Sequence, residues 1–232
     1  ELISIIVPNF LGEGDVMLTI LPDFSMYTFY TSMVGAKVEV MNKDESMEMK
    51  AGDVIERAKA CKAKLIIFSN PCNPTALKLE REEILEIIKA VDALVVVDEA
   101  YMDFSQGSVL DEIENYDNLI VLKTCSKAFG MAAIRLGFAA ANERLTGLLH
   151  TLKAPYNVNS MTQAAGCAIL EHEEFLKDCI RRIQESTQAL YQGMKELAER
   201  KKDLERLYST ATNFMKSRPS GLRKTIRAPN SL

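Results

Sequence analysis

Three short polar segments hold the side chains best suited to chemistry. They are residues 69–76 (SNPCNPTA), 98–101 (DEAY) and 123–130 (KTCSKAFG), the last followed by Arg135. Each segment comes directly after an apolar run of strand length, LIIF, ALVVV or LIVL. Because the carboxyl ends of parallel strands meet at one edge of a sheet, we expect the three segments to form a single site.

Lys127 is the candidate nucleophile. A lysine near a second cation, here Arg135, in a partly desolvated site is shifted toward its neutral form, which forms Schiff bases with aldehydes. Thr124 and Ser126 offer hydroxyl donors, and Arg135 offers a permanent cation. This donor set matches a phosphate group. The third segment therefore predicts a ligand that carries both an aldehyde and a phosphate.

The other two segments predict the rest of that ligand. Asp98 follows a buried strand and is an anion that needs a cationic partner, such as a protonated pyridine nitrogen. Asn73 and Tyr101 can donate hydrogen bonds to a phenolate-like oxygen. Aldehyde, phosphate, pyridinium and phenolate together describe pyridoxal 5'-phosphate, so we expect this cofactor.

Each of these residues also has a purely structural explanation. Lys127 alone could be a surface lysine, Asp98 could cap the next helix, and Tyr101 could simply pack. Asn73 could only shape a turn between two prolines, and the hydroxyls of the third segment are individually weak indicators. The agreement of four residue types at these spacings favours the functional interpretation. We interpret the neighbouring Glu99 as structural.

The elements that must position these residues alternate along the chain. Expected strands cover residues 16–21, 37–40, 64–68, 93–97, 118–122 and 135–140. Expected helices cover 1–10, 24–34, 54–61 and 80–91. Several strands are apolar throughout, as expected when helices cover both faces of a sheet. The pattern predicts an α/β fold with a mostly parallel sheet and helices on both faces.

Composition excludes several classes of protein. The 232 residues are 47% hydrophobic and 26% charged, and 28 Lys plus Arg against 32 Asp plus Glu give a formal charge of −4. This weakly acidic balance gives no global reason to bind nucleic acid or an anionic membrane. No apolar run approaches the roughly 20 residues of a membrane-spanning helix. The chain opens with Glu1 rather than a basic stretch, so we expect no signal peptide.

The cysteines and histidines indicate neither disulfides nor a metal site. The five cysteines lack C-x-x-C spacing, which predicts reduced thiols in a cytoplasmic protein. Only two histidines occur, His150 and His172, so we expect no histidine-based metal centre.

Four motifs follow one another along the chain. They are PDFSMY at 22–27, NPCNPT at 70–75, DEAYMDF at 98–104 and TCSKAFGMAAIRLGF at 124–138. These motifs resemble those of fold type I pyridoxal-phosphate enzymes of the aspartate aminotransferase superfamily and, within it, of the histidinol-phosphate aminotransferases. Chance agreement over this order of motifs is improbable, and the resemblance covers Glu1 to about Phe214.

The resemblance implies a role for each matching residue. Lys127 would hold the cofactor and move a proton, with Asp98 on the ring nitrogen and Tyr101 on the phenolic oxygen as further catalytic residues. Tyr27 and Asn73 would contact the substrate. The full cofactor set would be Phe24, Asn73, Asp98, Tyr101, Thr124, Ser126, Lys127 and Arg135.

The resemblance also implies three parts along the chain. Residues 1–155 would form the large cofactor-binding domain, 156–206 a helical connection, and 207–232 part of an α+β small domain. Within the connection, residues 171–206 have the pattern of one long charge-laced helix. We interpret the basic stretch 216–227 as a solvated loop.

Departures from the family pattern occur in the loop and at the ends. Ala76 stands where the family usually has glycine, and Cys72 replaces a common asparagine. Glu1-Leu2-Ile3 resembles the end of a segment that is typical of the family. Residues 226–232 resemble the residues that precede a second family segment, and this second segment contains a substrate-binding arginine. We therefore expect the protein to continue beyond this sequence.

The resemblance implies a homodimer that catalyses reversible transamination between histidinol phosphate and 2-oxoglutarate. In the reverse direction, glutamate would be the amino donor. Threonine-phosphate decarboxylases and aromatic aminotransferases of the same fold are the enzymatic alternatives, because fold does not separate them. A truncated relative that only binds cofactor or a partner protein is the non-enzymatic alternative.

Overall fold

The computed structural model describes residues 1–216. It separates into two compact units, Glu1–Ile180 and Arg181–Leu232, of which the second is described only as far as residue 216. The end of the expected small domain and most of the basic stretch 216–227 lie outside the described residues. The domain boundaries expected from the sequence stay predictions.

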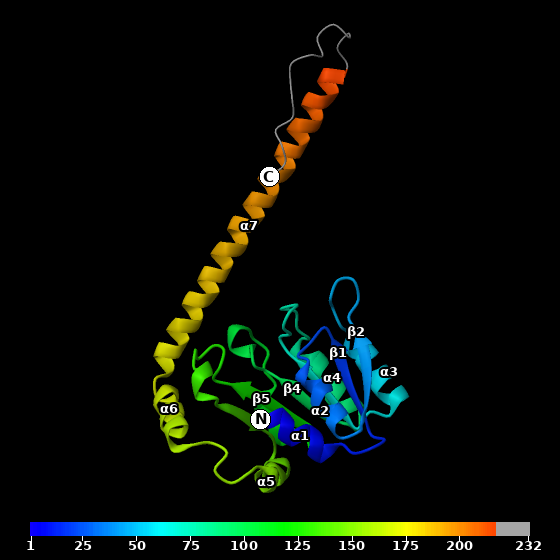
Figure 1. Cartoon of the computed structure of the whole chain (residues 1–232), viewed down its shortest axis with the longest axis vertical. Helices are drawn as coiled ribbons and strands as arrows, with labels where there is room; N and C mark the ends of the chain where they lie inside the picture. The colour runs from blue at the N-terminus through cyan, green and yellow to red at the C-terminus, as the bar shows by residue number, and fades with distance from the viewer. Residues whose placement is uncertain (217–232) are drawn as a thin grey trace. The chain divides into compact units, whose positions relative to one another are not determined.

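A six-stranded sheet forms the centre of the first unit (Figure 1). Its order is β2-β1-β3-β4-β5-β6, with parallel pairing from β2 to β5 and an antiparallel β6 beside β5. The bounds are β1 (Val16–Leu21), β2 (Lys37–Asn42), β3 (Leu65–Ser69), β4 (Leu94–Asp98), β5 (Leu119–Thr124) and β6 (Gly137–Ala140). The mostly parallel sheet predicted from the apolar strands is confirmed.

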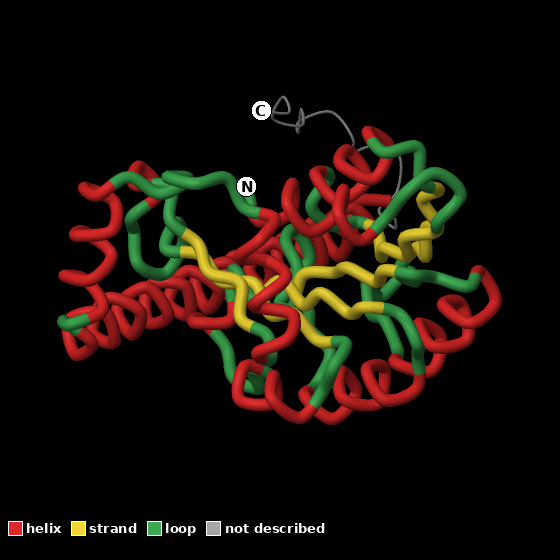
Figure 2. Tube along the Cα trace, turned by 90° about the horizontal axis from the view of Figure 1, so that it is seen from below, coloured by secondary structure: helices red, strands yellow, loops and turns green. Residues whose placement is uncertain are grey.

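Helices cover both faces of this sheet (Figure 2). Apolar residues of α3 and α4 pack on one face with Leu18, Phe68 and Val95, whereas those of α1, α2 and α5 pack on the other with Met17 and Ile67. The bounds are α1 (Leu2–Phe10), α2 (Met26–Met33), α3 (Ala51–Cys61), α4 (Arg81–Ala90), α5 (Glu143–Leu152), α6 (Ser160–Leu170) and α7 (Glu173–Lys216). Every residue of β3 is buried because both faces are covered.

Local capping explains where several of these helices begin. Asn142 and Asn159 accept hydrogen bonds from the backbone N–H groups of Leu145 and Thr162, which caps α5 and α6. Glu80 and Glu83 form a capping box at the start of α4. The long helix expected over 171–206 is present as α7 and extends to Lys216. Across residues 1–216, no helix has the length and apolarity needed to cross a bilayer.

Strand register brings the three polar segments to one edge of the sheet. Ser69 pairs with Asp98 across β3 and β4, and Asp98 pairs with Leu122 across β4 and β5. The antiparallel β6 begins at Gly137, opposite Thr124. A Cβ atom on Gly137 would lie 3.0 Å from the carbonyl oxygen of Lys123, so this close strand approach favours glycine.

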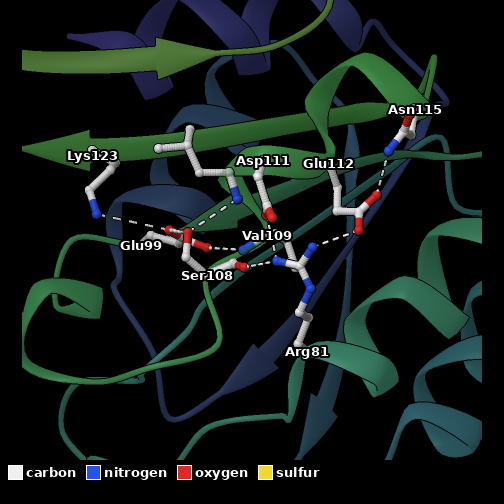
Figure 3. Close-up of polar contacts among 9 residues, drawn as sticks. Arg81, Glu99, Ser108, Val109, Asp111, Glu112, Asn115 and Lys123 are labelled. Atoms are coloured by element: carbon white, nitrogen blue, oxygen red, sulfur yellow. Dashed lines mark hydrogen bonds and ion pairs between the residues drawn. The ribbon is translucent and has the colours of Figure 1, made fainter.

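A polar network behind this edge holds the loop that follows β4 (Figure 3). The fully buried Glu99 accepts hydrogen bonds from Ser108 Oγ at 2.6 Å and Val109 N–H at 2.8 Å. Lys123 Nζ lies 4.0 Å from Glu99 and 2.8 Å from Asp103. Arg81, on α4, bonds to the carbonyl of Ser108 and pairs with the carboxylates of Asp111 and Glu112. The network therefore gives Glu99 the structural role expected of it.

We predict that Lys123→Met lowers the free energy of unfolding by about 2–3 kcal/mol, because it leaves two carboxylates without their cation, one of them fully buried. Chemical denaturation measures this change. Lys64→Met is the matched control, since it removes an exposed pair with Asp15 and should change stability little. Equal effects of the two substitutions would contradict the proposed importance of the network.

Candidate active site

Three of the predicted site residues meet beyond the ends of β3, β4 and β5. Asn73 Nδ2 donates a hydrogen bond to Tyr101 Oη at 2.8 Å. Lys127 Nζ lies 5.2 Å from the centroid of the Tyr101 ring, within the range of a cation–π contact. Asn73 and Lys127 are exposed and Tyr101 is half-buried, so an amide, a phenol and an amine from three strand ends are accessible to a ligand.

The carboxylate of Asp98 is held by two neutral donors. The backbone N–H of Ala100 donates to Oδ1 at 3.1 Å, and the hydroxyl of Tyr27 donates to Oδ2 at 2.8 Å. Tyr27 lies on α2 and is fully buried. The structure thus gives the Tyr27 hydroxyl a contact with Asp98 that the sequence did not predict, and the contact of Tyr27 with a substrate stays a prediction.

Burial dominates the electrostatics of this pair. It raises the pKa of the Asp98 carboxyl, while the hydrogen bonds from Tyr27 and Ala100 and the charge of Lys127 act in the opposite direction. Burial and the negative charges of Asp98 and Asp23 raise the pKa of Tyr27 well above its ordinary value. Tyr27 therefore stays protonated and must donate to Asp98. Across residues 1–216, no lysine or arginine forms an ion pair with Asp98, so a cationic ligand group would be stabilised there.

Phe24 lies just before α2 and contacts Tyr27, the residue that bonds to this carboxylate. Its ring is 49% exposed and stands edge-on to the Tyr27 ring, with the centroids 5.7 Å apart. An exposed aromatic side chain next to a polar site can contact the face of a planar ligand.

The hydroxyl-rich loop after β5 is the last part of the predicted site. Thr124 Oγ1 accepts a hydrogen bond from the backbone N–H of Ser126 at 3.1 Å, which brings these two hydroxyls to one turn. Arg135 has a left-handed backbone with φ of 55°, and its guanidinium donates to the carbonyl of Ala132 at 3.1 Å. Within residues 1–216, it forms no hydrogen bond with either hydroxyl, so the structure brings together Thr124 and Ser126 but not their predicted cation.

Sequence reasoning missed Asp23 as a site residue. Its carboxylate accepts hydrogen bonds from Phe24 N–H at 2.7 Å, from Ser69 N–H at 2.9 Å and from Ser69 Oγ. Burial raises the pKa of this carboxyl. The signal was present in the sequence, because Asp23 follows the end of β1 as Asp98 ends β4.

The two departures in the loop after β3 have distinct consequences. Ala76 adopts a φ of 59°, in the left-handed region that favours glycine. Cys72 is buried, and Lys43 Nζ lies 2.8 Å from its sulfur. The loop therefore keeps a left-handed turn that suits glycine, and Ala76 is strained in this conformation.

Comparisons with known proteins agree with this geometry. Residues 2–225 match the family model described as aminotransferase class I and II. The histidinol-phosphate aminotransferase of Clostridium novyi (strain NT) is 43% identical over 216 residues, which cover 93% of this chain and 59% of that protein. The chain thus spans about three fifths of the length of this relative.

Solved structures share the fold. The histidinol-phosphate aminotransferase of Sinorhizobium meliloti, in complex with pyridoxal-5'-phosphate, has a TM-score of 0.76 at 21% identity, with 81% of this chain and 52% of that one covered. The L-threonine-O-3-phosphate decarboxylase of Porphyromonas gingivalis has a TM-score of 0.67 at 24% identity, with 79% and 54% covered. These likenesses confirm the predicted fold class of the sheet-containing unit.

Asp98→Asn should stabilise the cofactor-free protein at neutral pH. A carboxyl whose folded pKa is raised contributes stability below its unfolded pKa and loses it as the pH rises through the folded pKa. The gain in melting temperature of the variant should therefore be small at about pH 4 and larger at about pH 7.5. Thermal unfolding at both pH values measures it. A gain that is the same at both values would contradict the raised pKa of Asp98.

Ala76→Gly should raise the free energy of unfolding by up to about 1 kcal/mol, because glycine adopts the left-handed backbone without the penalty of a Cβ atom. Denaturant unfolding checks this expectation. Ala63→Gly is a suitable control, since Ala63 has no left-handed backbone and glycine there should not stabilise. A loss of stability in Ala76→Gly would mean that the loop is not strained.

Proposed function

Since this chain belongs to the class I and II aminotransferase family, we propose that it forms the cofactor-binding part of a pyridoxal-phosphate-dependent aminotransferase. The observation that carries the proposal is Asp98, a carboxylate with a raised pKa, two neutral donors and no basic residue paired with it in residues 1–216. A protonated pyridine nitrogen is a cation of the right kind for this position.

The neighbouring residues fit the rest of that cofactor. Asn73 and Tyr101, already bonded to each other, would donate to its phenolic oxygen. Thr124 and Ser126 would hold its phosphate, and Arg135 would have to exchange its bond with the Ala132 carbonyl for the phosphate to join them. Phe24 would lie against the ring, because its side chain is exposed beside Tyr27.

Pyridoxal phosphate, when bound, supplies an aldehyde that condenses with amines and a ring that withdraws electrons from the adjacent carbon. Lys127 Nζ would hold the aldehyde carbon and, once displaced by the amine of a substrate, accept and return the proton exchanged at the α-carbon of that substrate. The Asp98 carboxylate, oriented by the Tyr27 hydroxyl, would keep the ring nitrogen protonated. Tyr101 would donate from Oη, and its ring would lie beside Lys127 Nζ.

We propose histidinol phosphate and 2-oxoglutarate as the substrates, with glutamate formed in exchange. The support is the 43% identity to a relative that bears the name histidinol-phosphate aminotransferase. A threonine-phosphate decarboxylase shares the fold, so the substrate has to be tested directly.

Assembly, location and domains belong to the same proposal. Phe29 and Met33 lie on α2 and are 51% and 65% exposed, as expected of a surface that a second copy covers. The five cysteines are free in the structure, which supports a reducing compartment such as the cytoplasm. Residues 1–155 would be the cofactor-binding domain, 156–206 the connection and 207–232 part of the small domain.

The purified protein should bind pyridoxal phosphate with a visible absorbance band from the lysine-bound cofactor. Lys127→Ala should lose this band, because it removes the amine that lies 5.2 Å from the centroid of the Tyr101 ring, beside the bond between Tyr101 and Asn73. Lys64→Ala, which removes an exposed lysine paired with Asp15, should keep it. Retention of the band in Lys127→Ala would refute the assignment of that residue.

Adding histidinol phosphate should convert the band to that of the aminated cofactor, and 2-oxoglutarate should restore it. Conversion by another amino acid but not by histidinol phosphate would leave an aminotransferase with a different substrate. Release of carbon dioxide from threonine phosphate without conversion would favour the decarboxylase. Full-length protein that forms no band would favour the non-enzymatic alternative.

A further inference from the structure

A second carboxylate lies beside Asp98 at the same edge of the sheet. Asp23 follows β1, and β1 is the neighbour of β3, which in turn pairs with β4. The Asp23 carboxylate accepts two hydrogen bonds from Ser69, and Ser69 is the register partner of Asp98. Ser69 of β3 therefore lies between the two acidic residues, bonded to the Asp23 carboxylate and paired in register with Asp98.

The groups around Asp23 leave much of its charge uncompensated. Its hydrogen bonds come from neutral donors, namely the N–H groups of Phe24 and Ser69 and the Ser69 hydroxyl. Lys43 lowers the pKa of Asp23, but its ammonium bonds to the carbonyl of Pro22 at 3.1 Å and to Cys72 Sγ at 2.8 Å. Across residues 1–216, no lysine or arginine pairs directly with Asp23.

Asp23 and Asp98 also affect each other. Burial is the main cause of the raised pKa of both Asp98 and Tyr27; the negative charge of Asp23 raises the pKa of Asp98 further, and the charges of both aspartates raise that of Tyr27. Like charges in a partly desolvated site favour one additional positive charge, either a shared proton or a cationic ligand group. A site with two carboxylates therefore prefers a cationic ligand more strongly than a site with one.

We propose that Asp23 is a positioning residue of the ring-nitrogen site, which strengthens the preference of Asp98 for a protonated pyridine nitrogen through its charge and holds Phe24 at the ring through the Phe24 N–H. This inference rests on the proposed function. Asp23 acts on the ligand through the field around Asp98 and through the backbone of Phe24, and Asp98 remains the group that touches the nitrogen.

The test separates charge from hydrogen bonding with two variants. Asp23→Asn removes the charge and keeps an oxygen that can accept from Phe24 N–H. Ser69→Ala keeps the charge of Asp23, together with its bonds from the Ser69 and Phe24 N–H groups, and removes only the hydroxyl donor. Asp23→Thr is a second neutral variant, in case Asp23→Asn folds poorly.

The first measurement is the affinity of the cofactor-free full-length protein for pyridoxal phosphate and for its carbocyclic analogue, in which carbon replaces the ring nitrogen. Asp23→Asn should weaken binding of pyridoxal phosphate roughly three- to tenfold, as expected for the loss of one nearby charge at an intermediate dielectric, and leave binding of the analogue nearly unchanged. Ser69→Ala should leave both affinities within about twofold of the parent protein.

The second measurement needs no cofactor. In protein labelled with carbon-13 at the aspartate carboxyl groups, the Asp98 resonance, assigned with Asp98→Asn, should titrate at a lower midpoint in Asp23→Asn than in the parent protein. Ser69→Ala should shift this midpoint less than Asp23→Asn does.

Three results would overturn the inference. One is an unchanged Asp98 midpoint in Asp23→Asn, and another is an equal loss of affinity of Asp23→Asn for both ligands. The third is a Ser69→Ala variant that loses affinity for pyridoxal phosphate, or shifts the Asp98 midpoint, as much as Asp23→Asn does. If the parent protein binds neither ligand, the proposed function fails, and with it the assignment of the site to a ring nitrogen. The NMR midpoint decides the coupling of Asp23 to Asp98 in either case.

Discussion

The carboxylate of Asp98 lies half-buried at the end of β4, where the Tyr27 hydroxyl and the Ala100 N–H hold it in place. Neither donor carries charge, so the ionised carboxylate keeps an unmet demand for a cation. A basic residue paired with it would satisfy that demand and remove the binding site. The surrounding structure provides orientation and burial for this anion and leaves its charge for a ligand.

The sheet and the loops behind it make this arrangement possible. Parallel register places Ser69, Asp98 and Leu122 side by side, so the segments that follow these strands must share one edge. Directly beside Asp98, the buried Glu99 points into a network with Ser108, Val109 and Lys123. Adjacent acidic residues thus serve opposite purposes. The charge of Glu99 is met within the protein, and the charge of Asp98 is not.

The aromatic and acidic residues after β1 form a supporting layer for the same site. Tyr27 is buried and orients Asp98, and Phe24 is exposed beside it. Asp23 connects this segment to β3, since its carboxylate accepts hydrogen bonds from the backbone N–H groups of Phe24 and Ser69. Family membership alone would not reveal this layer, because it depends on which side chains are buried and on what they bond to.

The sequence by itself determined the α/β alternation, the sheet edge where the polar segments lie and the identity of Asn73, Asp98, Tyr101 and Lys127 as one group. Apolar runs that end in polar motifs contain this information, because strand burial and the common edge of parallel strands are local and topological consequences of pattern.

Only the tertiary structure decided the buried position of Tyr27 against Asp98, the bond of Arg135 to Ala132 and the pairing of Asp23 with Ser69. These contacts join residues whose burial and rotamers depend on packing between elements distant in the chain. The spacing along the sequence does not encode whether the charge of Asp98 or that of Glu99 is compensated within the protein, because desolvation and hydrogen bonding in three dimensions decide this.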